Sequence, residues 1–296
     1  IKMKKILLIF GTRPEAIKMA PLVHQFLKYK SDFKTKICLT GQHLEMLNQV
    51  LDFFNIEADY NLNVMKTNNN LHVLTSDIIK GVKDIIEDFN PHYVFVHGDT
   101  TTTFASSLAA FYSNCKICHI EAGLRTYDKH SPFPEEINRQ LTSKLSDFHF
   151  APTREAKHNL LDENVQEDSI VVTGNTVIDA LFIGLDKIQK TENTLIKKIS
   201  LMTENKDIIL VTGHRRENHG EGIKNICYAL KEIASKLKKV LIIYPVHLNP
   251  KIQGPVNNIL KNIDNIKLIK PLNYEEFIWL MKKSKLIITD SGGIQE

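Results

Sequence analysis

The sequence has few cysteines, little net charge and no long apolar run. Its 296 residues include four cysteines, which do not suggest the disulfide framework of a small secreted protein. The net charge of +4 is spread over 38 basic and 34 acidic residues, without the long basic run that favours nucleic-acid binding. No apolar stretch approaches the roughly 20 residues of a membrane helix, and no cleavable leader is recognisable. We therefore expect a cytoplasmic protein with no nucleic-acid or membrane partner.

One segment, Cys115-Lys116-Ile117-Cys118-His119, matches the attachment motif of c-type haem. Haem attachment would require export, and no second cysteine pair completes a zinc site. The same segment is apolar enough to form a buried strand. We therefore expect neither a metal nor any other cofactor.

Short apolar runs alternate with longer helical patterns, which predicts doubly wound parallel sheets. The first series has expected strands at 6–10, 36–39, 93–96, 116–120 and 148–151, and expected helices at 14–27, 43–54, 71–89, 101–112, 135–145 and 154–161. After a strand at 169–173, a helix opens near residue 176 and a polar stretch covers about 187–205. A second series follows, with strands at 208–212, 240–244, 266–269 and 286–289 and helices beginning near residues 223, 253 and 274. Because this length exceeds what one core usually organises, we expect two Rossmann-like domains, residues 1–174 and 175–296, with a cleft between them.

Charged and polar groups follow the expected strands at four places. These are Gly11-Thr12-Arg13-Pro14-Glu15, His97-Gly98-Asp99-Thr100, Glu121-Ala122-Gly123-Leu124-Arg125-Thr126 and Gly213-His214-Arg215-Arg216-Glu217-Asn218. Open α/β sheets bind ligands at the carboxyl ends of their strands. A fifth segment, Asp290-Ser291-Gly292-Gly293, follows the last strand and is typical of a phosphate cradle at the start of a helix. The pattern indicates an enzyme for an anionic, phosphate-bearing substrate.

Several of these residues also have ordinary structural interpretations. Asp99 is either a helix N-cap or a base that contacts substrate. Glu121 ends an apolar strand, where a charge is costly unless it has a partner or ligand, so a functional role is favoured. Glu135 and the next glutamate suit the first turn of a helix as dipole partners. His214 lies beside two arginines, which disfavour its cationic form unless a phosphate is present.

Taken together, the motifs resemble those of the non-hydrolysing UDP-N-acetylglucosamine 2-epimerases. The matching segments are Gly-Thr-Arg-Pro-Glu-Ala-Ile-Lys-Met-Ala-Pro at 11–21, Gly-Asp-Thr at 98–100, His-Ile-Glu-Ala-Gly-Leu-Arg-Thr at 119–126, Pro-Glu-Glu-Ile-Asn-Arg at 134–139, Gly-His-Arg-Arg-Glu-Asn at 213–218 and Asp-Ser-Gly-Gly-Ile-Gln-Glu at 290–296. The resemblance implies a GT-B fold, in which two Rossmann-like domains face each other. It also implies reversible conversion of UDP-GlcNAc to UDP-ManNAc through 2-acetamidoglucal, without metal or cofactor, for bacterial surface polysaccharide synthesis.

The resemblance also assigns roles to individual residues. The implied catalytic residues are Asp99, Glu121, Glu135, His214 and Arg13. The implied substrate-binding residues are Arg13, Lys18, His214, Phe277, Ser291, Gly292, Gly293 and Glu296. A homodimer is expected, with UDP-GlcNAc and UDP-ManNAc as the small-molecule partners.

Many bacterial members of the family are activated by UDP-GlcNAc bound beside the catalytic pocket. The residues that look like this second site are Gln42, Glu135, Arg215 and His247. Two nearby positions depart from the family pattern, because Asn68 stands where some members have arginine and Glu45 where they have glutamine. Family members also continue beyond Glu296, so the second domain is expected to be incomplete in this sequence.

Three other functions remain open at this point. A GT-B glycosyltransferase would need an acceptor for the sugar. A hydrolysing epimerase would release free ManNAc and UDP, although its first-strand motif usually departs from Arg-Pro-Glu. An inactive UDP-sugar-binding module would bind without proton exchange at C2.

Overall fold

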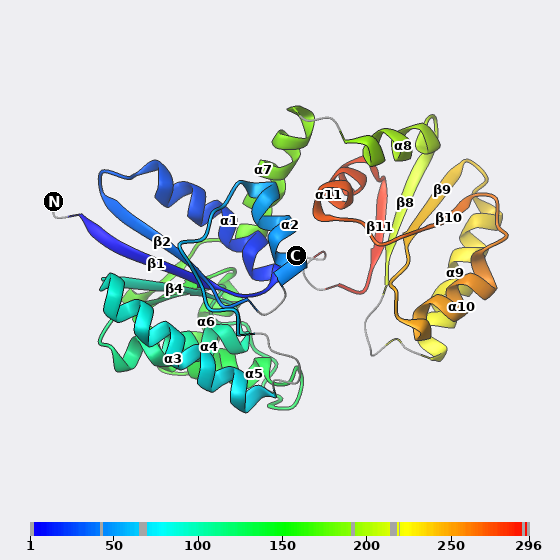
Figure 1. Ribbon diagram of the computed structural model, residues 1–296. Helices are drawn as coiled ribbons and strands as arrows, with labels where there is room; N and C mark the ends of the chain where they lie inside the picture. Colours follow the sequence, from blue (N-terminus) through cyan, green and yellow to red (C-terminus); the bar gives the residue numbers. More distant parts are fainter. Residues whose placement is uncertain are drawn as a thin grey trace. The chain divides into compact units, whose positions relative to one another are not determined.

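The computed structural model describes residues 3–41, 44–64, 70–190, 193–213, 218, 220–291 and 294. The chain divides into two compact units, Ile1–Ala180 and Leu181–Glu296 (Figure 1). The boundary expected from sequence, between residues 174 and 175, lies just before helix α7 (Thr176–Lys190), and the division falls inside that helix. Each unit is built on its own parallel sheet.

The first unit contains a seven-stranded sheet in the order β3-β2-β1-β4-β5-β6-β7. All of its pairings are parallel, and the strands are β1 (Lys4–Phe10), β2 (Phe33–Leu39), β3 (Tyr60–Asn61), β4 (Tyr93–His97), β5 (Lys116–Ile120), β6 (Phe148–Ala151) and β7 (Ile170–Val172). Residues 6–10 of β1 are all buried, as expected for a central parallel strand that is covered on both faces. The strand order reverses between β1 and β4, which makes their carboxyl ends the switch point of this sheet.

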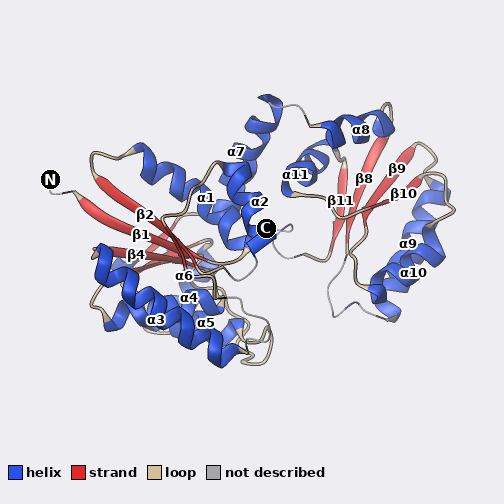
Figure 2. Ribbon diagram, viewed as in Figure 1, coloured by secondary structure: helices blue, strands red, loops and turns tan. Residues whose placement is uncertain are grey.

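Helices cover both faces of this sheet (Figure 2). They are α1 (Arg13–Lys28), α2 (Leu44–Phe54), α3 (Leu71–Phe89), α4 (Thr101–Tyr112), α5 (Glu135–Leu145), α6 (Arg154–Asp162) and the first part of α7, with a short 3₁₀ helix, η1 (Glu167–Ser169). On one face, Ile78 and Val82 of α3 and Ala105 of α4 form a core cluster with Leu7 and Val94 of the strands. The packing of α3 and α4 against the sheet holds the strand ends in place, and the polar segments at 11–15, 97–100 and 121–126 follow these strand ends.

The second unit contains a four-stranded parallel sheet in the order β10-β9-β8-β11. The strands are β8 (Asp207–Thr212), β9 (Val240–Pro245), β10 (Ile266–Ile269) and β11 (Leu286–Thr289), and the helices are α8 (Thr194–Thr203), α9 (Glu221–Lys236), α10 (Pro250–Leu260) and α11 (Tyr274–Lys283). One core cluster joins the sheet to α9 and α10, and another joins it to α8 and α11 (Figure 2). The switch point of this sheet lies between β8 and β11.

The predicted α/β architecture with two parallel sheets is confirmed. Three elements were missed, and one of them is the short 3₁₀ helix η1. The polar stretch expected over about 187–205 contains α8, whose residue Ile199 is buried, and the two-residue strand β3 had no sequence signal. Among the described residues, no helix is both long enough and apolar enough to span a membrane.

Candidate functional site

The turn after β1 is held by a buried glutamate. Thr12 caps α1 in a capping box with Glu15, which explains the spacing of this motif. Glu15 is 2% exposed, and its Oε2 accepts hydrogen bonds from the backbone N–H of Gly11 (3.1 Å) and Thr12 (2.7 Å). Its Oε1 accepts one from Thr100 Oγ1, at 2.8 Å. Glu15 therefore fastens the turn after β1 to the turn after β4, across the switch point.

Glu121 lies directly after β5, in a left-handed backbone conformation with φ of 63°. Its side chain is 11% exposed, and its Oε2 forms an ion pair with Nζ of Lys18 on α1. Asn175, which follows β7, donates an amide hydrogen to the same oxygen at 3.1 Å. The structure thus brings together Lys18 and Glu121, which the sequence analysis assigned to the same substrate from separate motifs.

Asp99 follows β4, and its carboxylate is 26% exposed. Arg139 Nη2 of α5 lies 2.5 Å from Asp99 Oδ2, and Asn138 Nδ2 donates to the Asp99 backbone oxygen at 3.0 Å. Burial raises the pKa of Asp99, and the attraction of Arg139 acts in the opposite direction. The N-cap interpretation of Asp99 is wrong, because Thr100 is the residue whose side chain caps α4. The Asp99 side chain is therefore not used by the helix.

Asp99 and Glu121 lie close together at the ends of two neighbouring strands. The Glu121 Oε1 atom would be 3.7 Å from a Cβ placed on Gly98, and β4 pairs directly with β5. The negative charge of Glu121 acts to raise the pKa of Asp99. Two acidic groups with separate cationic partners can exchange protons with a bound substrate.

The first turn of α5 contains two glutamates that differ in environment. Glu135 is the first residue of the helix and is partly buried. Glu136 is fully buried, and it accepts hydrogen bonds from the backbone N–H of Thr126 (3.1 Å) and Tyr127 (3.0 Å). Burial acts to raise the pKa of Glu136, but these hydrogen bonds outweigh it, and the pKa is lowered. Glu136 is therefore more than a helix-dipole partner, because it anchors the 126–127 loop.

Three histidines are buried on the neighbouring strands β4, β5 and β6. Burial lowers the pKa of His97 and of His119 to about 3, and it also lowers the pKa of His149. His119 Nε2 lies 2.7 Å from the Gly98 carbonyl oxygen, and His97 Nε2 lies 3.8 Å from Glu121 Oε2. Cys118 and His119 of the haem-like motif are buried strand residues of β5, as the strand interpretation expects. Within the described ranges, no group of three or more His, Cys, Asp or Glu side chains is placed to hold a metal ion.

The switch point of the second unit is also lined with polar groups. Tyr244 of β9 donates to the Gly213 backbone oxygen at 2.8 Å, and Asn218 donates to Asp290 Oδ2 at 2.9 Å. These contacts fasten both ends of the 213–218 segment to the carboxyl ends of the strands. Ser291 is partly buried, and its backbone N–H donates to Thr289 Oγ1 at 3.0 Å.

Other expected site residues have diverse positions. Arg13 is partly buried at the start of α1, Phe277 packs against the α8 and α11 core cluster, and His247 is exposed after β9. The remaining expected residues lie outside the described part of the chain; these are Gln42, His214, Arg215, Gly292, Gly293 and Glu296. The same is true of Asn68 and of the side chain of Glu45.

Four residues of the site were not predicted individually from sequence: Arg139, Asn138, Asn175 and the buried Glu15. Glu15 had a local signal, the Thr-x-x-Glu spacing of a capping box. Asn175 also had one, because it follows a predicted strand as the acidic residues do. The contact of Arg139 with Asp99 spans 40 residues of sequence and had no local signal.

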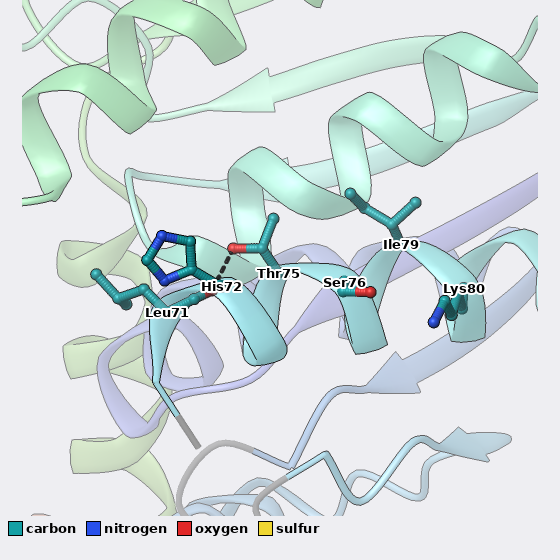
Figure 3. A pocket seen from close by; sticks show the side chains of 6 residues that line it. All are labelled: Leu71, His72, Thr75, Ser76, Ile79 and Lys80. Atoms are coloured by element: carbon teal, nitrogen blue, oxygen red, sulfur yellow. Dashed lines mark hydrogen bonds between the residues drawn. The ribbon is translucent and has the colours of Figure 1, made fainter. Parts of the chain in front are cut away.

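A surface hollow of about 470 Å³ lies elsewhere, along α3 (Figure 3). Its lining residues are Leu71, His72, Thr75, Ser76, Ile79 and Lys80. All six belong to one helix, and none is among the residues gathered at the strand ends. We therefore place the candidate site at the strand ends and not in this hollow.

Comparison with known proteins adds independent information. A family model described as UDP-N-acetylglucosamine 2-epimerase matches residues 25–296. A UDP-N-acetylglucosamine 2-epimerase of Neisseria meningitidis is 52% identical over 294 residues, which cover 99% of this chain and 79% of that protein. One of Salmonella borreze is 56% identical over 297 residues, covering 99% of this chain and 78% of that protein.

Solved structures agree with this comparison. The crystal structure of UDP-GlcNAc 2-epimerase from Neisseria meningitidis bound to UDP-GlcNAc aligns with a TM-score of 0.88 at 52% identity, over 99% of this chain and 79% of that chain. The Methanocaldococcus jannaschii UDP-GlcNAc 2-epimerase in complex with UDP-GlcNAc and UDP aligns with a TM-score of 0.78 at 34% identity, over 98% and 80% of the two chains.

Proposed function

Because this chain belongs to the UDP-N-acetylglucosamine 2-epimerase family, we propose that it interconverts UDP-GlcNAc and UDP-ManNAc without hydrolysing them. The observation that carries the chemical part of this proposal is the pairing of Asp99 with Arg139 and of Glu121 with Lys18 at the ends of β4 and β5. Inversion at a carbon that bears hydrogen requires a proton to leave one face and another to arrive at the opposite face. Two acidic groups, one on each face of C2, would meet that need.

In the proposed reaction, one carboxylate removes the proton from C2 of the sugar. The electron pair of the C2–H bond forms the C1=C2 double bond, and the C1–O bond breaks with its pair leaving on UDP. The intermediate is 2-acetamidoglucal, with UDP still bound. A protonated carboxyl group then donates to C2 on the other face, and the diphosphate oxygen bonds again to C1. Asp99, Glu121 and Glu135 are the candidates for these proton transfers.

Departure of UDP requires positive groups near the diphosphate. Arg13 and His214 are proposed to stabilise the developing charge, while Lys18, Phe277, Ser291, Gly292, Gly293 and Glu296 are proposed to hold the substrate. Support comes from the topology, since Arg13 and Ser291 each follow a strand at the switch point of their own sheet. No metal or organic cofactor takes part in this proposal.

We further propose a homodimer and a second UDP-GlcNAc site that regulates turnover, formed by Gln42, Glu135, Arg215 and His247. Both proposals rest on the family resemblance. The UDP-ManNAc product would serve the synthesis of surface polysaccharide.

Proton NMR of UDP-GlcNAc incubated with this chain in D₂O tests the function. The expected result is deuterium at C2 together with the anomeric signal of UDP-ManNAc. Free ManNAc and UDP would instead identify a hydrolysing enzyme. Binding of UDP with no exchange at C2 would contradict epimerase activity and indicate a binding module.

A further inference from the structure

Helix α5 holds Asp99 at two points. Arg139 Nη2 lies 2.5 Å from Asp99 Oδ2, and the neighbouring Asn138 donates to the Asp99 backbone oxygen at 3.0 Å. The arginine side chain is 12% exposed and the aspartate side chain 26%. A charge-assisted contact in a partly buried position restricts the carboxylate more strongly than an exposed ion pair does.

Arg139 is itself held on its other side. Its Nη1 lies 3.4 Å from Oε2 of Glu136, whose side chain has no exposed surface. Glu136 is in turn fixed by the backbone N–H groups of Thr126 and Tyr127 and by Gln140. The guanidinium therefore sits between an anchored carboxylate and Asp99, and its position is determined before any substrate arrives.

Among the described residues, Arg139 is the cation in direct contact with Asp99. Glu121 faces Asp99 from the end of β5, and Lys18 faces it from α1, but Lys18 is paired with Glu121. Glu136 on α5 contacts Arg139 and not Asp99. The buried histidines of β4 and β5, His97 and His119, are neutral near pH 7, since burial lowers the pKa of each to about 3.

We propose that Arg139 is a positioning residue that fixes the Asp99 carboxylate and keeps it ionised, ready to accept a proton. This inference rests on the proposed function for the role of Asp99 in turnover. The contact itself and its effect on Asp99 do not depend on that function. Burial and, to a smaller extent, the charge of Glu121 raise the pKa of Asp99, and Arg139 is the strongest opposing group. Its removal is therefore expected to leave Asp99 protonated over a wider pH range.

The experiment follows the Asp99 carboxyl carbon by ¹³C NMR across pH in the whole chain, with Asp99→Asn used to assign the signal. In Arg139→Gln, the titration midpoint of Asp99 is expected to rise by about 1 to 3 pH units. The acidic limb of the pH–rate profile for C2 deuterium exchange should move by the same amount, and the exchange rate should recover at higher pH. A purely structural role would lower the rate at every pH without moving that limb.

Arg139→Lys is the conservative variant and guards against misfolding of the glutamine variant. Lysine keeps the charge but lacks the planar fork that reaches both Asp99 and Glu136. We expect its midpoint to stay close to that of the unchanged chain while exchange falls by about tenfold or more at all pH values. Exchange at the unchanged rate in Arg139→Lys would overturn the positioning role.

Arg125→Gln is the matched control. The Arg125 side chain has no exposed surface, its Nε donates to Glu163 Oε1 at 2.6 Å, and Arg125 is not among the charged groups that shift the pKa of Asp99. The Arg125→Gln variant should have a lower thermal stability but the same titration midpoint of Asp99. An unchanged midpoint in folded Arg139→Gln overturns the proposal. If the unchanged chain exchanges no deuterium, the proposed function fails, whereas the carboxyl titration still decides the role of Arg139.

Discussion

At the scale of single residues, the buried acids are stabilised in two different ways. Glu15 and Glu136 are satisfied by hydrogen bonds from backbone N–H groups and from hydroxyl or amide side chains. Asp99 and Glu121 instead have a cation, Arg139 or Lys18, as a direct partner, and Glu136 makes only a longer contact of 3.4 Å with Arg139. The carboxylate oxygens of Glu15 and Glu136 accept hydrogen bonds from the protein itself, which suits a structural role. The second pair retains charge at the strand ends, where a substrate can meet it.

Replacing Glu121 by glutamine should separate chemistry from binding. Glutamine keeps the size of the side chain but cannot accept a proton, so C2 deuterium exchange is expected to fall by about 10² to 10⁴. Binding of UDP, measured by calorimetry, should change by only a few fold. The control is Glu155→Gln, an exposed change on α6 that should leave both unaltered. A rate within threefold of the unchanged chain would show that Glu121 transfers no proton.

The buried histidines predict how stability depends on pH. Burial lowers the pKa of His97 and His119 from 6.5 to about 3, so the unfolded chain binds protons through this window while the folded chain does not. The free energy of unfolding should therefore fall as pH drops below 6.5. His119→Gln should remove up to about 1.4 kcal/mol per pH unit of that slope. Urea unfolding between pH 5 and 7.5 measures it, and identical slopes in the two proteins would contradict the assignment.

At the scale of elements, the segment after β5 depends on one glycine. Gly123 has a φ of +94°, and a Cβ there would overlap the Ala156 carbonyl group of α6, with the carbon at 2.8 Å. The segment after β5 can therefore lie against α6 only if residue 123 has no side chain. This packing orients the chain that runs from Glu121 to the loop anchored by Glu136.

Gly123→Ala should destabilise the protein more than the matched change Gly174→Ala. Gly174 also has a positive φ, +81°, but nothing lies within 4 Å of the place that a Cβ would take there. Gly174→Ala should lower the free energy of unfolding only by the strain of a left-handed alanine, about 1 to 2 kcal/mol. Gly123→Ala adds a backbone clash, and its loss should be greater than about 3 kcal/mol. Urea unfolding compares them, and equal losses would mean that the contact with α6 relaxes freely.

Most elements could be predicted from sequence because the strands of parallel sheets are short, mostly apolar runs. The expected strands at 116–120, 148–151, 266–269 and 286–289 coincide with β5, β6, β10 and β11. Helix α8 was missed because it lies within the stretch of about 187–205, which is rich in lysine, threonine, glutamate and asparagine. The Asn193 N-cap and the spacing of Ile196 and Ile199 are the signals that mark it.

The candidate site was predictable in its residues but not in its contacts. Asp99 and Glu121 could be singled out because each follows a strand, a local property. Their partners could not, since Arg139 is 40 residues from Asp99 and Lys18 is 103 residues from Glu121 in sequence. Thr100 rather than Asp99 caps α4 because the choice depends on the backbone conformation at each residue, and both residue types are good caps.

At the scale of the whole molecule, four core clusters of the described residues each lie within one unit. The clusters around Leu7 and Ala151 contain only residues of the first unit, and those around Leu210 and Ile242 only residues of the second. Each sheet also has its own switch point. Damage to one core should therefore act first on the unit that contains it.

Leu210→Ala, which removes a fully buried side chain from β8, tests this expectation. It should lower local stability in the second unit by about 2 to 5 kcal/mol. Amide hydrogen exchange, followed by mass spectrometry, should accelerate in β8, β9 and β11 and stay unchanged in β1 and β4. Leu7→Ala should give the reverse pattern, and equal acceleration in both sheets would show that they open together.

The order of strands in the second sheet also matters while the chain is being made. The first strand of that sheet, β8, pairs on one side with β9 and on the other with β11, the last strand in sequence. One edge of β8 therefore stays unpaired on the ribosome until Leu286–Thr289 have been synthesised. An open apolar strand edge invites pairing with other chains. Expression of this protein should accordingly benefit from chaperones that cover that edge until β11 has been made.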